Sequence, residues 1–108
     1  MGIDTAAHTG AIDATGKTIC VLGSGLLKPF PKDNRLLFNK ISEKGLLISE
    51  HLPSFSGSKF ALIQRNRITS GLSLALILCA SKLVGGAMVQ TEIANQQMIP
   101  IFCPSLKN

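Results

Sequence analysis

Short apolar runs separated by helix-like segments are the feature that most constrains the fold of this chain. The runs are Thr18–Leu22, Leu46–Ser49, Leu74–Cys79 and Ile99–Cys103. A continuous apolar run of this length, rich in branched side chains, is typical of a strand that is covered on both faces. We therefore predict four strands, and we expect those at Thr18–Leu22 and Leu74–Cys79 to be buried.

Helical patterns alternate with these runs. The segments are Asp4–Ala14, Asp33–Lys44, a helix around Gln64–Ser70, and Gly86–Gln97. Gly16, Gly45 and Gly71 are predicted to end the first three helices, and Asp33 to cap the second. The second helix is amphipathic, and the side chains that should face the core are Leu36, Leu37, Phe38 and Ile41. Alternation of this kind predicts an α/β fold, a Rossmann-like parallel sheet with helices on both faces.

Length and composition favour a single cytoplasmic domain over residues 1–108. No apolar run approaches the roughly 18 residues of a membrane helix, and the first residues lack the pattern of a secretory signal. Cys20, Cys79 and Cys103 lie inside apolar runs without a CxxC pair, so buried free thiols are expected. Neither a metal site nor a cofactor is predicted.

The strand ends indicate where a ligand would bind. In a parallel sheet, ligands bind outside the carboxyl ends of the strands. This rule selects the loops Gly23–Lys32, Leu52–Lys59 and Lys82–Gly86, each of which contains lysine. A dinucleotide fingerprint is disfavoured, because Lys28 stands where its third glycine would fall. The turn Gly23-Ser24-Gly25 could hold one phosphate through its N–H groups and hydroxyl, or it could be a tight turn that merely needs glycine.

Cations gather in Lys59–Ser73, a stretch that lies within an acid-free span from Glu50 to Glu92. With a net charge of +5, this favours a polyanionic partner, although a solvated helix face is the alternative. Arg65 and Arg67 would lie about 200° apart on a helix, so both cannot face one ligand squarely. The candidate contacts for nucleic acid are Lys59, Arg65, Asn66, Arg67, Gly23, Ser24, Gly25 and Lys32. No nucleophile is placed beside a base, and we predict that the chain is not an enzyme.

Six ordered segments together resemble the Rossmann-like domain of the DNA-processing protein A family (DprA, also called Smf). They are GIDTAAHTGAI (2–12), TICVLGSG (18–25), FPKDN (30–34), GLLISE (45–50), KFALIQRNRITSGLS (59–73) and GGAMVQTEIANQQMIPIFCP (85–104). The resemblance implies a homodimeric protein that binds single-stranded DNA without chemistry and delivers it to the RecA recombinase in natural transformation. It also implies that Lys59 is the lysine of the family's basic pocket, and that Arg65 and Arg67 are its paired arginines.

The chain departs from the family pattern in two ways. Leu62 stands where relatives have an aromatic residue, with Phe60 as a possible substitute for base stacking. Relatives also carry an upstream strand and a Gly-Ser-Arg phosphate loop, without which we expect an uncovered sheet surface and weaker DNA binding. The chain is then a fragment, a truncated product or a swapped oligomer.

Two alternatives remain open at this point. VGGAMVQTE (84–92) partly matches the PGGxGTxxE motif of nucleotide-hydrolysing, lysine-decarboxylase-like enzymes, through Gly85, Gly86, Thr91 and Glu92. The other alternative is a foldable remnant without binding activity.

Overall fold

The computed structural model describes residues 2–77, 79 and 92–102 of the chain. Internal contacts divide the chain into two compact units, Met1–Leu62 and Ile63–Asn108, called here the N-terminal and C-terminal units. Each unit is described by itself. That the whole chain forms one domain stays a prediction.

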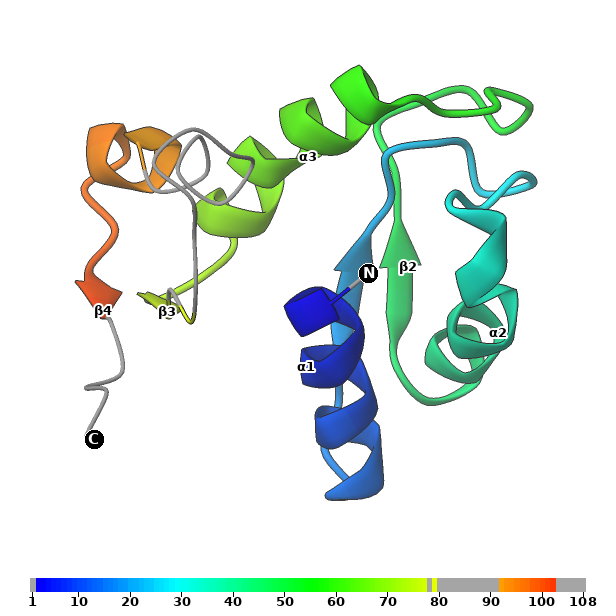
Figure 1. Cartoon of the computed structure of the whole chain (residues 1–108), viewed down its shortest axis with the longest axis horizontal. Helices are drawn as coiled ribbons and strands as arrows, with labels where there is room; N and C mark the ends of the chain where they lie inside the picture. The colour runs from blue at the N-terminus through cyan, green and yellow to red at the C-terminus, as the bar shows by residue number, and fades with distance from the viewer. Residues whose placement is uncertain (1, 78, 80–91, 103–108) are drawn as a thin grey trace. The chain divides into compact units, whose positions relative to one another are not determined.

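Helices and strands alternate along the chain, as predicted (Figure 1). The elements are α1 (Gly2–Asp13), β1 (Ile19–Val21), the 3-10 helix η1 (Lys32–Asn34), α2 (Arg35–Lys44), β2 (Leu46–Ile48), α3 (Lys59–Gly71), β3 (Leu76–Ile77) and β4 (Ile101–Phe102). Residues 92–96 are also helical, and the rest of the helix predicted over Gly86–Gln97 lies mostly outside the described residues. None of the helices within the described ranges has the length and apolar character needed to cross a membrane.

The strands are parallel, which confirms the predicted α/β class. β1 pairs with β2, with Ile19 opposite Leu46 and Val21 opposite Ile48. β3 pairs with β4 in the same sense. The described strands thus form two sheets of two strands each rather than one larger sheet.

The core of the N-terminal unit lies between the β1–β2 pair and helices α1 and α2. Its buried members are Ile12, Cys20, Leu22, Phe38 and Ile41, with Leu37 and Leu47 packed against them. Cys20 and Leu22 alternate along the strand with Ile19, which is 53% exposed. Period-two alternation therefore sends Cys20 and Leu22 into this core, whereas on the other face Ile19 is exposed and Val21 is buried.

Helix α2 corrects two predictions. Leu36 was expected in the core, yet it is 79% exposed. At 100° per residue it lies about 200° from Phe38, away from the buried face that Phe38 and Ile41 define. Asp33 does not cap the helix, because the η1 turn precedes it and the N-cap position is Asn34. The Asn34 side chain instead donates to Thr5 Oγ1 at 3.2 Å, which ties α2 to α1.

Gly45 ends α2 as predicted. Its N–H donates to the carbonyl of Ile41 at 2.7 Å. A Cβ at this position would stand 2.2 Å from the carbonyl oxygen of Thr18, so the turn into β2 has no room for a side chain.

The predicted burial of Leu74–Cys79 is wrong for the residues that the structure describes. Leu74 is 95% exposed and Ile77 65% exposed. Cys79 is likewise exposed, whereas Cys20 is buried as expected and Cys103 lies outside the described residues. Two paired strands of two residues each offer little surface to cover a side chain, so an apolar sequence here does not ensure burial.

Helix α1 ends one residue earlier than predicted. The left-handed residue is Thr15, with φ of 58°, and not Gly16. The Gly16 N–H donates to Ala11 O at 2.8 Å and the Thr15 N–H to Ile12 O at 3.0 Å, the two bonds of a Schellman motif. A β-branched residue is strained in this conformation, which glycine adopts freely.

We expect Thr15→Gly to stabilise the N-terminal unit by about 1 kcal/mol, because it removes the strain at a positive φ. Thermal unfolding followed by circular dichroism should show a midpoint that is a few degrees higher. Thr15→Ala is the control, since alanine keeps a Cβ and should gain little. A lower midpoint for Thr15→Gly would contradict this account of the helix end.

Candidate nucleic-acid interface

The loops after β1 and β2 lie at one edge of their sheet, because the two strands are parallel. Two backbone hydrogen bonds join these loops. The Gly25 N–H donates to Phe55 O at 2.9 Å, and the Leu27 N–H donates to Pro53 O at 3.1 Å. The two loops therefore form one bonded surface, called here the strand-end edge.

Close packing explains the glycines of the Gly23-Ser24-Gly25 turn. A Cβ on Gly25 would lie 2.1 Å from Leu52 O, and a Cβ on Gly23 would lie 2.8 Å from the backbone of Leu62. Ser24 is fully buried, and its carbonyl accepts a hydrogen bond from the Ser49 hydroxyl. The tight-turn interpretation accounts for this geometry. A phosphate contact by the turn stays a prediction.

Helix α3 begins at Lys59, five residues before the predicted Gln64. Ser58 caps it, because the Ser58 Oγ accepts the Ala61 N–H at 3.1 Å. The sequence prediction missed this start because it placed Lys59 at the end of the loop Leu52–Lys59. The first turn contains no acidic residue and Lys59 is exposed. The positive end of the helix dipole and the Lys59 ammonium thus favour an anion at the same place.

Lys59 lies at the edge predicted for it. Gly57, with φ of +86°, brings the chain against Ser24, since a Cβ on Gly57 would lie 2.9 Å from the Ser24 Cβ. The segment that enters α3 therefore packs on the turn that follows β1.

Phe60 does not point in the same direction as Leu62, where relatives have an aromatic residue. Residues two apart on a helix point about 200° from each other. Leu62 is half-buried against Gly23, and Phe60 is 70% exposed. Phe60 instead presents its ring to solvent, where it could stack on a base.

In the C-terminal unit, Arg65 is held by its neighbour. The Arg65 Nε donates to Asn66 Oδ1 at 3.0 Å, and Asn66 is only 9% exposed. Arg67 is exposed, and its carbonyl accepts a bond from Gln97 Nε2 at 2.9 Å. The buried amide of Asn66 orients Arg65, while the exposed Arg67 lies about 200° around the helix from it.

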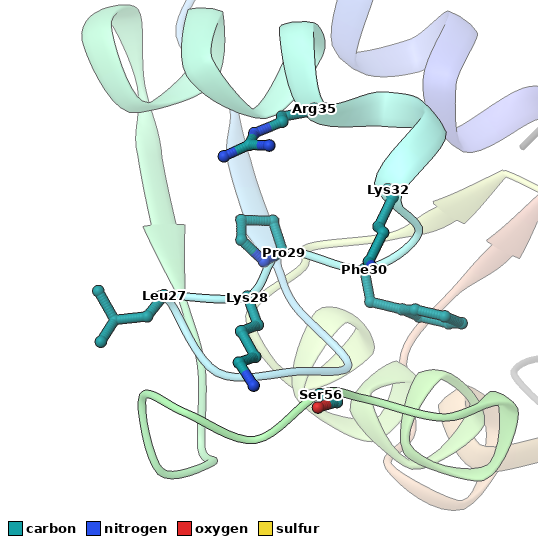
Figure 2. Close-up of a pocket in the computed structure, with 7 residues that line it drawn as sticks. All are labelled: Leu27, Lys28, Pro29, Phe30, Lys32, Arg35 and Ser56. Atoms are coloured by element: carbon teal, nitrogen blue, oxygen red, sulfur yellow. The ribbon is translucent and has the colours of Figure 1, made fainter.

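A basic pocket of about 350 Å³ opens beside the strand-end edge. Its lining residues are Leu27, Lys28, Pro29, Phe30, Lys32, Arg35 and Ser56 (Figure 2). Lys32 was among the sequence candidates, but Lys28 and Arg35 were not. The signal that could have found them is the run of cations around two prolines, in and just after the loop that follows β1.

Two segments that the sequence analysis singled out lie wholly or mostly outside the described residues. The loop Lys82–Gly86 lies outside the described residues. The same holds for residues 84–91 of the enzyme-like VGGAMVQTE motif, of which only Glu92 is described.

A family model for DNA recombination-mediator protein A matches residues 1–107. The chain belongs to this family. It is 39% identical over 101 residues to the DNA processing protein DprA of Streptococcus pneumoniae, which covers 94% of this chain and 36% of that protein. The chain thus spans about a third of the length of this relative.

Solved structures agree with this family membership. An X-ray structure of DprA from Streptococcus pneumoniae matches 97% of this chain and 38% of its own, with a TM-score of 0.86 and 35% identity. DNA processing protein A from Helicobacter pylori, described for its single-stranded DNA binding mode, matches 84% of this chain and 43% of its own, with a TM-score of 0.77 and 28% identity. The α/β arrangement is therefore that of DprA.

We expect Gly25→Ala to destabilise the N-terminal unit by about 3 kcal/mol, because its Cβ would overlap two carbonyl oxygens in the bonded loops. Urea unfolding followed by circular dichroism measures the loss. Gly10→Ala is the matched control: nothing lies within 4 Å of its Cβ position inside α1, and alanine should stabilise the helix. Equal urea midpoints for Gly25→Ala and the unchanged chain would show that the two loops are not closely packed around Gly25.

Proposed function

We propose that this chain binds single-stranded DNA through the strand-end edge and does no chemistry on it. The observation that carries the proposal is the start of α3, where a serine-capped helix end free of acidic residues presents exposed Lys59. Phosphates are the anions that such a site favours.

Two features favour a single strand over a duplex. Phe60 exposes its ring one residue after Lys59, and unstacked bases can pack on an aromatic face. The Helicobacter pylori relative is described by its single-stranded DNA binding mode.

The role in the cell is proposed for the whole protein, because this chain spans only about a third of its relative. We propose a cytoplasmic homodimer that passes bound single strands to the RecA recombinase during natural transformation. Sedimentation of the chain tests the dimer. The rate at which RecA assembles on oligonucleotides, with and without the chain, tests the transfer, and an unchanged rate would contradict it.

We expect Lys59→Glu to weaken binding of a labelled single-stranded oligonucleotide at least tenfold, because it replaces a phosphate contact with a repulsive charge. Fluorescence anisotropy measures the affinity, with a duplex of the same sequence for comparison. Lys17→Glu is the matched control, since Lys17 is exposed and precedes β1, so it lies toward the opposite edge of the sheet. Equal losses for both variants would reject a localised site.

The affinity of the unchanged chain should fall as salt rises. Each phosphate that a cation neutralises on a single strand contributes a slope of about 0.7 in log affinity against log salt concentration. Lys59→Gln should reduce this slope by about that amount. Anisotropy titrations at several salt concentrations give both slopes, and a signal independent of salt would count against phosphate contacts.

A further inference from the structure

The basic pocket has a composition that strand binding at Lys59 does not explain. Three of its seven lining residues are cations, Lys28, Lys32 and Arg35, and none is acidic. Figure 2 shows Lys28 extended toward the segment that carries Ser56, with Arg35 reaching from α2 on the other side of Pro29. Cations from a loop, a 3-10 turn and a helix thus line one small space.

Within the described part of the chain, these cations have no partner. No hydrogen bond or ion pair joins the side chains of Lys28, Lys32 or Arg35 to another described residue. Like charges that line one cavity repel each other. An anion in the pocket would remove this repulsion.

The frame beneath the cations is held in place by its backbone. The Lys28 N–H donates to Gly25 O at 3.0 Å, and the Asn34 N–H donates to Pro31 O at 3.2 Å. Pro29 and Pro31 restrict φ between these two bonds. A backbone that is already fixed loses little conformational entropy when a ligand binds.

The size of the pocket limits the ligand to one small molecule or one residue of a polymer. About 350 Å³ is near the lower end of the volumes found for small-molecule sites. Phe30 and Pro29 add apolar surface on which a base or sugar can pack, and Ser56 adds a hydroxyl. This combination of cations, an aromatic ring and a hydroxyl fits a nucleotide.

The number of cations favours a phosphomonoester over a phosphodiester. A phosphodiester within a strand carries one negative charge, whereas a phosphomonoester carries about 1.5 to 2 at neutral pH. We propose that the pocket binds one nucleotide that carries a phosphomonoester, with Lys28, Lys32 and Arg35 supplying the positive charge that favours this group. The nucleotide is either the phosphorylated end of a strand or a free mononucleotide, and only the first source rests on the proposed function.

Two titrations of the full chain separate these sources. Isothermal titration calorimetry compares thymidine monophosphate with thymidine. Anisotropy compares one single-stranded oligonucleotide carrying a phosphate at its 5′ end, at its 3′ end, or at neither. If the chain binds thymidine monophosphate about tenfold or more tightly than thymidine, the ligand is a free mononucleotide. If a terminal phosphate raises the affinity for the oligonucleotide by the same factor, the ligand is a strand end. Either increase is called here the phosphate-dependent gain in affinity.

Variants of the pocket residues test whether these side chains cause the phosphate-dependent gain in affinity. We expect Lys28→Gln and Arg35→Gln each to abolish most of the phosphate-dependent gain. Lys17→Gln and Lys40→Gln, which replace exposed lysines outside the pocket, should leave it unchanged. All four side chains are exposed, so the variants should fold.

Two results would overturn the proposal: no gain from the phosphate in either titration, or equal losses in pocket and control variants. Binding of the oligonucleotide without a terminal phosphate reports the proposed function separately. If this oligonucleotide binds but the terminal phosphate adds no affinity, only the pocket proposal is rejected. If thymidine monophosphate binds but the oligonucleotide does not, only the proposed function is rejected.

Discussion

The parallel pairing of β1 with β2 is the constraint on which the candidate interface depends. Because α2 returns the chain to the start of the sheet, both strands end at the same edge and both following loops meet there. Two backbone hydrogen bonds then join the loops. Every cation of the N-terminal unit that we assign to ligand binding lies in these loops or in the helix that directly follows one of them.

Packing and binding make different demands on the same edge. Gly23 and Gly25 have no room for a Cβ, and Ser24 is buried beneath the second loop. These residues fix the course of the chain. Their neighbours, among them Lys28, Lys32 and Lys59, are exposed and can contact a ligand. Glycine-rich segments can therefore be essential to a binding edge without touching the ligand.

We propose two kinds of anion site in the N-terminal unit. At the start of α3, one ammonium and a helix end favour the single charge of a strand phosphate. In the basic pocket, three cations line a space of about 350 Å³, and their charge suits a phosphomonoester better than a phosphodiester. If both sites bind, the chain would distinguish the end of a strand from its interior.

Sequence alone determined the order of the elements, the parallel α/β class and the end of α2 at Gly45. These follow from local periodicity and from glycine, whose effects act over a few residues. The strand-end rule also identified the edge that carries Lys32 and Lys59. The family resemblance pointed to the same fold, which the solved DprA structures confirm.

Tertiary contacts, and not local sequence, determine which side chains are buried and which lie next to one another. Leu36 and Leu74 have core-like side chains but are exposed, because burial depends on the surface that another element supplies. Asn34, predicted as part of a capped helix, bonds to Thr5 across the unit. Lys28, Lys32 and Arg35 share a pocket because the chain turns between them at Pro29 and Pro31, a change of direction that no periodic pattern encodes.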